Sequence, residues 1–136
     1  MSNANSLQLD LVTPEQLFFS GAVDMVEVPG ELGDFGVLAN HAPFVSLVRS
    51  GLVTVHNEGG EKSRLFVSGG VAEVNPEGCT ILAEQAQDVS DWTLDKARSE
   101  LEAARKAADD AITDEDKQHT AAHVRACEAI VEGLAG

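Results

Sequence analysis

The segment Gly33-Asp34-Phe35-Gly36-Val37-Leu38-Ala39-Asn40-His41-Ala42-Pro43-Phe44 separates short apolar bursts with glycine, amide, imidazole and proline rather than with ordinary polar spacers. Glycine reaches backbone angles that are closed to other residues, while proline fixes its own φ and pushes the residue before it into an extended conformation. We therefore predict a tight β-corner shaped by Gly33 and Gly36. Phe35, Val37 and Phe44 supply the apolar surface that holds the corner against the rest of the domain.

On either side of this corner, the first ninety residues hold many short apolar runs separated by turn residues. Leu7, Leu9 and Leu11 alternate with polar residues, as a half-buried strand requires. Further strands are predicted at 17–19, 23–28, 44–48, 52–56, 64–67, 71–74 and 80–84, with turns at 49–51, 57–60, 68–70 and 75–78. Many short strands with no helix between them are typical of an antiparallel sandwich or a flattened barrel.

The composition changes close to residue 88. All four prolines lie before this point, whereas the 46 residues after Ser90 are rich in Ala, Glu, Asp, Arg and Lys, which favour helix. We therefore predict two domains, a β-sandwich over residues 1–88 and a helical tail over residues 89–136.

The tail shows helical periodicity in two stretches. Thr93 is a predicted N-cap, and it is followed by an apolar stripe at Leu94, Ala97, Leu101, Ala104, Ala108 and Ala111. Thr113 and three acidic residues predict a second helix start, with a stripe at Val124, Cys127, Val131 and Leu134. A short connection favours an antiparallel helical hairpin, so the predicted fold class is α+β.

The net charge of −14 and the isoelectric point near 4.4 exclude several classes of partner. Nucleic-acid binding needs clustered Lys and Arg to displace counterions, and the chain has only nine such residues. Acidic membrane surfaces are excluded as direct partners for the same reason. No apolar run approaches the roughly 18 residues that span a bilayer, so we expect a chain that is not exported and not inserted in a membrane.

A catalytic reading rests on Glu31, Asp34 and His41, which lie within eleven positions of one another. These side chains could converge as metal ligands or as an acid and a base, which leaves a small β-sandwich enzyme or a metal-binding module as the alternative function. The chain lacks a His-x-His pair, a Gly-x-Ser-x-Gly elbow and a phosphate-binding Gly-x-x-x-x-Gly-Lys loop. A generic binding module is the third hypothesis.

Three sequence words occur in an order and at a spacing that resemble one known family. They are Phe-Gly-Val-Leu-Ala-Asn-His-Ala-Pro at 35–43, the run at 47–52, and Val-Ser-Gly-Gly-Val-Ala-Glu-Val at 67–74. Together they resemble the epsilon subunit of bacterial F-type ATP synthases, a relative of the mitochondrial delta subunit. The likeness extends from Val12-Thr13-Pro14-Glu15 to Leu94-Asp95-Lys96-Ala97-Arg98, which is most of the chain.

This resemblance implies a ten-stranded sandwich in a noncatalytic rotor subunit of the central stalk, which couples proton translocation to ATP synthesis. It implies contacts with the gamma subunit and the c ring, and transient contacts with the catalytic alpha and beta subunits. The subunit would be peripheral, at the cytoplasmic face of the bacterial inner membrane, and held there by the complex alone. The partner-binding residues that the resemblance implies are Glu31, Asp34, Phe35 and His41.

The same resemblance bears on ligands and regulation in the tail. The segment at 94–99 resembles a motif by which some epsilon subunits hold ATP, so Asp95, Arg98 and Arg105 are the candidate nucleotide contacts. The second helix adds only Arg125 as a further guanidinium, so we expect no bound cofactor. From Thr113 onward, five acidic residues oppose two basic ones, and the negative sign predicts at most a weak inhibitor of ATP hydrolysis.

Overall fold

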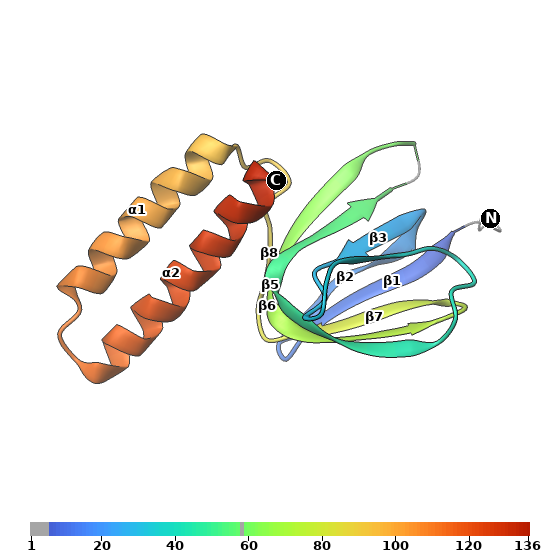
Figure 1. Cartoon of the computed structure of the whole chain (residues 1–136), viewed down its shortest axis with the longest axis horizontal. Coiled ribbons are helices and arrows are strands. Elements are labelled where there is room, and N and C mark those ends of the chain that lie inside the picture. Colours follow the sequence, from blue (N-terminus) through green and yellow to red (C-terminus); the bar gives the residue numbers. More distant parts are fainter. Residues whose placement is uncertain (1–5, 58) are drawn as a thin grey trace. The chain divides into compact units, whose positions relative to one another are not determined.

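The computed structural model describes residues 6–57 and 59–136 (Figure 1). The chain divides into two compact units, of which the first ends at Ser90 and the second is Asp91–Gly136. The first unit contains the strands β1 (Leu7–Thr13), β2 (Gln16–Val23), β3 (Met25–Val28), β4 (Phe35–Val37), β5 (Phe44–His56), β6 (Lys62–Asn75), β7 (Gly78–Ala83) and β8 (Ala86–Asp88). The second contains the helices α1 (Leu94–Asp110) and α2 (Asp114–Ala135).

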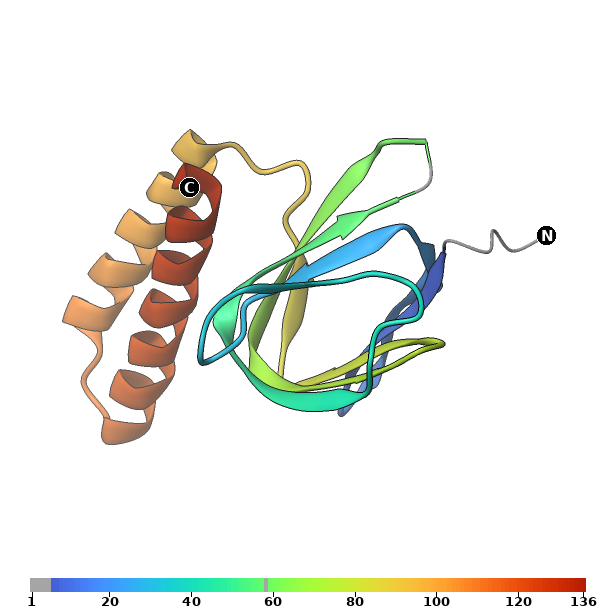
Figure 2. The same cartoon turned by 45° about the vertical axis from the view of Figure 1, so that its right-hand side comes forward.

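The strands pair in the order β2-β1-β7-β6-β5-β3-β4, and β8 pairs with β6 away from this path. The two longest strands, β5 and β6, pair with each other along most of their lengths and bend together (Figure 2). One part of β6 pairs with β7 and the other part pairs with β8. Each long strand therefore contributes to two layers of a sandwich.

The first layer consists of β2, β1, β7 and the halves of β6 and β5 at 70–75 and 44–48. The second layer consists of β4, β3, β8 and the other halves of β5 and β6. The eight strands thus form ten strand segments, five in each layer, which agrees with the expected ten-stranded sandwich. The predicted α+β class is confirmed. One pairing departs from the antiparallel expectation, because β1 and β7 are parallel.

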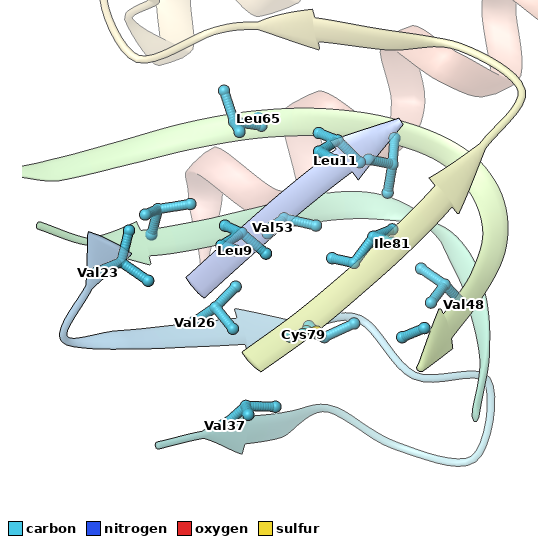
Figure 3. Close-up of a cluster of buried hydrophobic side chains, with 14 of the residues drawn as sticks. Leu9, Leu11, Val23, Val26, Val37, Val48, Val53, Leu65, Cys79 and Ile81 are labelled. Carbon is cyan, nitrogen blue, oxygen red and sulfur yellow. The ribbon is translucent and has the colours of Figure 1, made fainter. Parts of the chain in front are cut away.

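The core lies between the two layers, where alternate residues of each strand point inward (Figure 3). The first layer contributes Leu9, Leu11, Cys79 and Ile81, and the second contributes Val26, Val37, Val53 and Leu65. All eight are buried. Full burial of a Leu, Ile or Val side chain is worth about 1.5–3 kcal/mol, so this interior is the main source of stability in the first unit.

The turns predicted at 49–51 and 68–70 are wrong, because both segments continue a strand. They are the bends at which β5 and β6 pass from one layer to the other. Gly70 has a φ of +148°, and a Cβ there would collide with the carbonyl oxygen of Leu82. Glycine is needed at this position to let two strands approach closely, and not to reverse the chain.

Three smaller differences concern two strand assignments and the role of Gly36. The run predicted as one strand at 23–28 is split at Asp24, whose N–H donates to the carbonyl of His56. The short strands β4 and β8 were not predicted. Gly36 does not shape the corner as predicted: it lies in β4 outside the positive-φ residues, and a Cβ there would make only an ordinary contact with Met25.

Both predicted helix starts are confirmed. The hydroxyl oxygen of Thr93 accepts a hydrogen bond of 3.1 Å from the backbone N–H of Lys96, and Thr113 accepts one of 3.1 Å from Asp116. Such caps satisfy backbone donors that have no partner within the helix. Between the helices, Leu101 and Ala104 of α1 pack with Cys127 of α2, as the predicted stripes require. The second unit is a helical hairpin with a small apolar seam.

Candidate functional site

The corner at 29–44 is pinned to β5 by backbone hydrogen bonds. The N–H of Glu31 donates to the carbonyl of Leu47 at 2.9 Å, and the N–H of Arg49 donates to the carbonyl of Pro29 at 2.9 Å. Gly30 also forms a bridge with Val48. These bonds fix the position of the corner relative to the first layer of the sandwich.

A tight turn forms the tip of the corner. The N–H of Gly33 donates to the carbonyl of Gly30 at 3.1 Å, and Gly33 has a φ of +137°, as the sequence predicted for this glycine. The turn leaves Leu32 fully exposed and Glu31 exposed. An apolar side chain and a negative charge are therefore held side by side at a defined point on the surface.

Asp34 is paired within the chain. Its Oδ1 accepts a hydrogen bond of 2.5 Å from Nη2 of Arg49. Both side chains remain exposed, to 69% for Asp34 and 47% for Arg49, so the pair is a surface ion pair. Glu31 forms no such pair among the described residues, which makes it the carboxylate of the corner that is open to a partner.

Phe35 and His41 hold the corner together through Phe44. The rings of Phe35 and Phe44 meet edge to face with centroids 5.1 Å apart, and the His41 ring lies 5.2 Å from that of Phe44. Nδ1–H of His41 donates to the carbonyl of Ala42 at 2.9 Å. Both predicted partner-binding aromatic residues are therefore half-buried supports of the corner.

The alternative enzyme or metal site is not favoured by this geometry. Asp34 is directed to Arg49, while His41 is directed to the Phe44 ring and the Ala42 carbonyl. Within residues 6–57 and 59–136, no three His, Cys, Asp or Glu side chains gather as metal ligands. Asp34 and His41 are therefore engaged with different partners, and the Glu31 carboxylate pairs with neither of them.

The outer face of the first layer carries a feature that the sequence analysis missed. Residues paired across neighbouring strands point to the same face, and one such line crosses all five strands of this layer. It joins Leu47, Val71, Leu82, Val12 and Leu17, which we call the apolar row. Three of these side chains are more than half exposed: Leu17 at 58%, Leu47 at 58% and Leu82 at 54%.

The apolar row is bordered by a hollow and by acidic side chains. The hollow measures about 340 Å³ and is lined by Val12, Thr13, Pro14, Gly70, Leu82, Ala83 and Glu84. The neighbouring line of the same face includes Val45, which is 68% exposed, together with Glu73 and Asp10. A contiguous exposed apolar strip with a polar rim is typical of a protein-binding surface.

The corner and the apolar row adjoin. The carbonyl of Leu47, at one end of the row, accepts the N–H of Glu31. In the sequence, one signal indicated an apolar outer face, namely the alternation of Val45 and Leu47 with Ser46. Because Val48 follows directly, the run also resembles a strand that is buried on both faces.

The candidate nucleotide contacts all lie on α1. Asp95, Arg98 and Arg105 are exposed, and their spacing of three and seven residues places them on one face of the helix. Nη2 of Arg105 lies 3.9 Å from Oε2 of Glu128 on α2, so this guanidinium already faces a carboxylate. The face carries both signs of charge.

Neither cysteine is an activated nucleophile. Burial raises the pKa of the Cys79 thiol to about 11, and burial together with the nearby Glu100 carboxylate raises the pKa of Cys127. Both thiols are protonated at neutral pH, and only the thiolate is strongly nucleophilic. Within the described residues, neither helix is long and apolar enough to cross a membrane.

Comparison with known proteins identifies the family. The family model for the β-sandwich domain of the ATP synthase delta/epsilon chain matches residues 6–89. The ATP synthase epsilon chain of Paramagnetospirillum magneticum is 45% identical over 132 residues, which covers 97% of this chain and 99% of that protein. That of Maricaulis maris is 48% identical over 127 residues, which covers 93% and 95% respectively.

Two solved structures share the fold. One chain in the OSCP/F1/c-ring structure of Euglena gracilis mitochondrial ATP synthase gives a TM-score of 0.68 at 24% identity, covering 96% of this chain and 79% of that one. Another, in the central stalk/c-ring structure of Tetrahymena thermophila mitochondrial ATP synthase, gives 0.57 at 12% identity, covering 94% and 96%.

Proposed function

This chain belongs to the ATP synthase delta/epsilon family, and we propose that it serves as a noncatalytic subunit of the rotating central stalk. Its role is to couple proton translocation to ATP synthesis that other subunits perform. The observation that carries this proposal is the apolar row, which crosses the whole width of one sandwich layer. The similar folds in a central stalk/c-ring assembly support the same role.

The apolar row is the docking face for the gamma subunit. Its three leucines remain more than half exposed in the isolated chain, and its two valines are half-buried. Burying the exposed part of each leucine is worth a fraction of the about 1.5–3 kcal/mol for full burial, before the entropy cost of association. The rim is acidic, with Asp10, Glu73 and Glu84 on the same face. A complementary partner surface has an apolar centre and a basic border.

The tip of the corner is the contact with the c ring. Glu31 offers a carboxylate that has no ion-pair partner among the described residues, and Leu32 offers an exposed apolar side chain. Both are presented by a turn that is hydrogen-bonded to the sandwich. Asp34 contributes through its pair with Arg49, which braces the turn. Phe35 and His41 contribute by packing on Phe44.

These partners also determine the location of the subunit. The net charge of −14 repels anionic lipid surfaces, so attachment to the cytoplasmic face of the bacterial inner membrane is indirect, through gamma and the c ring.

The hairpin is at most a weak inhibitor of ATP hydrolysis, and it binds no ATP. Residues 113–136 carry a net charge of −3, which disfavours docking against acidic segments of the alpha and beta subunits. On α1, Arg105 is opposed by Glu128, which leaves Arg98 to neutralise phosphates next to Asp95. Calorimetry of the full chain with millimolar ATP should show no binding heat, and saturable binding lost in Arg98→Ala would contradict this.

A co-purification experiment tests the central proposal. The full chain is mixed with its gamma subunit, and the complex is compared with one made from a Leu47→Asp/Leu82→Asp variant. We expect a loss of at least about tenfold in affinity, since both changes place charges in the buried centre of the interface. The matched control is Ile112→Asp, an exposed apolar position at 85% in the other unit, which should bind normally.

Two outcomes would overturn the proposal. The first is equal binding of gamma by the wild-type chain and the double variant. The second is turnover by the isolated chain that depends on an added metal and disappears in His41→Ala, which would favour the enzyme reading instead.

A further inference from the structure

We propose that β2 is an acceptor for an added β-strand, supplied by an extended segment of the partner that covers the apolar row. This inference rests on the proposed function, because it assigns a second mode of contact to the same partner. It concerns main-chain hydrogen bonds at the edge of the sheet rather than side chains on its face.

The first observation is that β2 is a long open edge. It ends the strand path, and its backbone pairs only with β1 among the described residues. β2 has 8 residues, whereas the second layer ends in strands of only 3 residues each, β4 and β8. Very short edge strands are a common protection against unwanted pairing, and β2 lacks it.

The second observation is the composition of this edge. Gln16–Val23 contains no charged residue and no proline, although the first unit has twelve acidic and three basic residues. Exposed edge strands commonly carry lysine, an inward-facing charge or proline, which prevent pairing with another chain, and β2 has none of these residues. The edge therefore remains competent for pairing.

A bulge limits the pairing segment to part of the strand. Leu11 pairs with Phe19 and Val12 pairs with Leu17, so Phe18 is the extra residue. Bulges bend a strand locally, which separates the end at 16–18 from the regular stretch at 19–23. The acceptor is this regular stretch of five residues, Phe19-Ser20-Gly21-Ala22-Val23.

The third observation is continuity with the apolar row, which ends on β2 at Leu17. A partner that covers the row therefore reaches β2 at Leu17, across the bulge from the acceptor stretch that begins at Phe19. The acidic residues Glu15 and Asp24 flank β2 at its two ends. The complementary segment is therefore uncharged in the middle and basic at its ends.

The charge also argues against a second copy of this chain as the occupant. Two copies would bring first units with net charges of −9 together, with Glu15 and Asp24 of each near the shared edge. Like charges at an interface oppose association. A basic stalk subunit can supply both the added strand and the positive charges that complement Glu15 and Asp24.

Residue-resolved amide hydrogen exchange of the full chain, alone and bound to its gamma subunit, tests the inference. In an antiparallel pair, alternate residues of an edge strand direct their N–H groups away from the sheet. In the free chain, alternate amides of 19–23 should exchange about 100-fold faster than their neighbours. In the complex, the same amides should slow by at least about tenfold. Methyl NMR signals of Leu47 and Leu82 report independently whether the face is docked.

The readouts separate the possible failures. Methyl shifts without protection at 19–23 would overturn strand addition and leave the proposed docking face standing. Absence of both would remove the gamma contact itself. Concentration-dependent protection in the free chain would identify a second copy as the occupant and would also overturn the proposal.

Two proline variants provide the matched comparison, Gly21→Pro and Ala22→Pro. Only one of them removes an N–H that points outward, and exchange in the free chain shows which. That variant should keep its melting temperature and lose at least about tenfold in gamma affinity. Normal affinity in this folded variant would contradict strand addition.

Discussion

Nη2 of Arg49, at the bend of β5, donates a hydrogen bond of 2.5 Å to Oδ1 of Asp34 in the corner. The corner is thereby linked by charge to the same strand that fixes it through Glu31 and Leu47. Because both charged side chains are largely exposed, the pair is expected to contribute below about 1 kcal/mol. Its effect is on the orientation of the tip more than on stability.

The first prediction concerns this pair. Asp34→Ala and Arg49→Ala should each leave the fold intact, and a double-mutant cycle by urea denaturation should give a coupling of below about 1 kcal/mol that falls at high salt. In the assembled enzyme, Asp34→Ala should loosen proton coupling less than Glu31→Ala, because Glu31 is the carboxylate of the corner without an ion-pair partner in the described part of the chain. Unchanged proton pumping in the Glu31→Ala/Asp34→Ala variant would contradict the c-ring assignment.

A second prediction concerns the layer crossing at Gly70. Gly70→Ala should lower the free energy of unfolding by about 2 kcal/mol or more, because φ is +148° and the new Cβ would overlap the Leu82 carbonyl. Gly36→Ala is the control, since its Cβ would meet only the Met25 sulfur at 3.7 Å. Thermal unfolding of the two variants should differ clearly, and equal melting temperatures would show that the strands can move apart at Gly70.

The third prediction tests the cap of α2. Thr113→Ala removes the acceptor for the Asp116 N–H and should cost about 1 kcal/mol of local stability. Amide exchange in the first turn of α2 should accelerate by about fivefold, while exchange in the sandwich stays constant. Thr113→Ser, which keeps the hydroxyl, should behave like the wild type. Equal acceleration in both variants would mean that the hydroxyl is not the stabilising group.

The fourth prediction is that the first unit folds alone. Its core cluster is built entirely from residues before position 87. A chain truncated after Ser90 keeps the hydrogen bonds from Val89 to Arg64 and from Arg64 to Ser90. It should melt in one cooperative transition and bind gamma. A broad, noncooperative transition would show that the hairpin completes the core.

The last prediction addresses regulation. Deleting residues 91–136 should raise ATP hydrolysis by the assembled enzyme by less than about twofold, because the net charge of −3 over 113–136 opposes docking on acidic catalytic subunits. The control is a variant in which Glu128 and Glu132 are replaced by Lys, which should inhibit more strongly than the wild type. A several-fold rise in the rate of ATP hydrolysis after the deletion would show that the charge of the hairpin does not determine the strength of inhibition.

The sequence by itself determined the features that depend on neighbours along the chain. The alternation of Leu7, Leu9 and Leu11, the hydroxyls of Thr93 and Thr113, and the turn at Gly33 were all predicted from local patterns and are confirmed. The resemblance carried in the words at 35–43 and 67–74 gave the family and the sandwich. These conclusions hold because capping, strand periodicity and backbone conformation act over a few residues.

Only the tertiary structure decided which apolar residues are left outside. Leu47, Val71, Leu82, Val12 and Leu17 come from five strands, and strand register alone brings them into one row. The bends at 49–51 and 68–70 looked like turns because glycine marks both a reversal and a close crossing of strands. The roles of Asp34 and His41 depended equally on distant partners. Long-range pairing and packing therefore set the interaction surface, while local chemistry set the elements that build it.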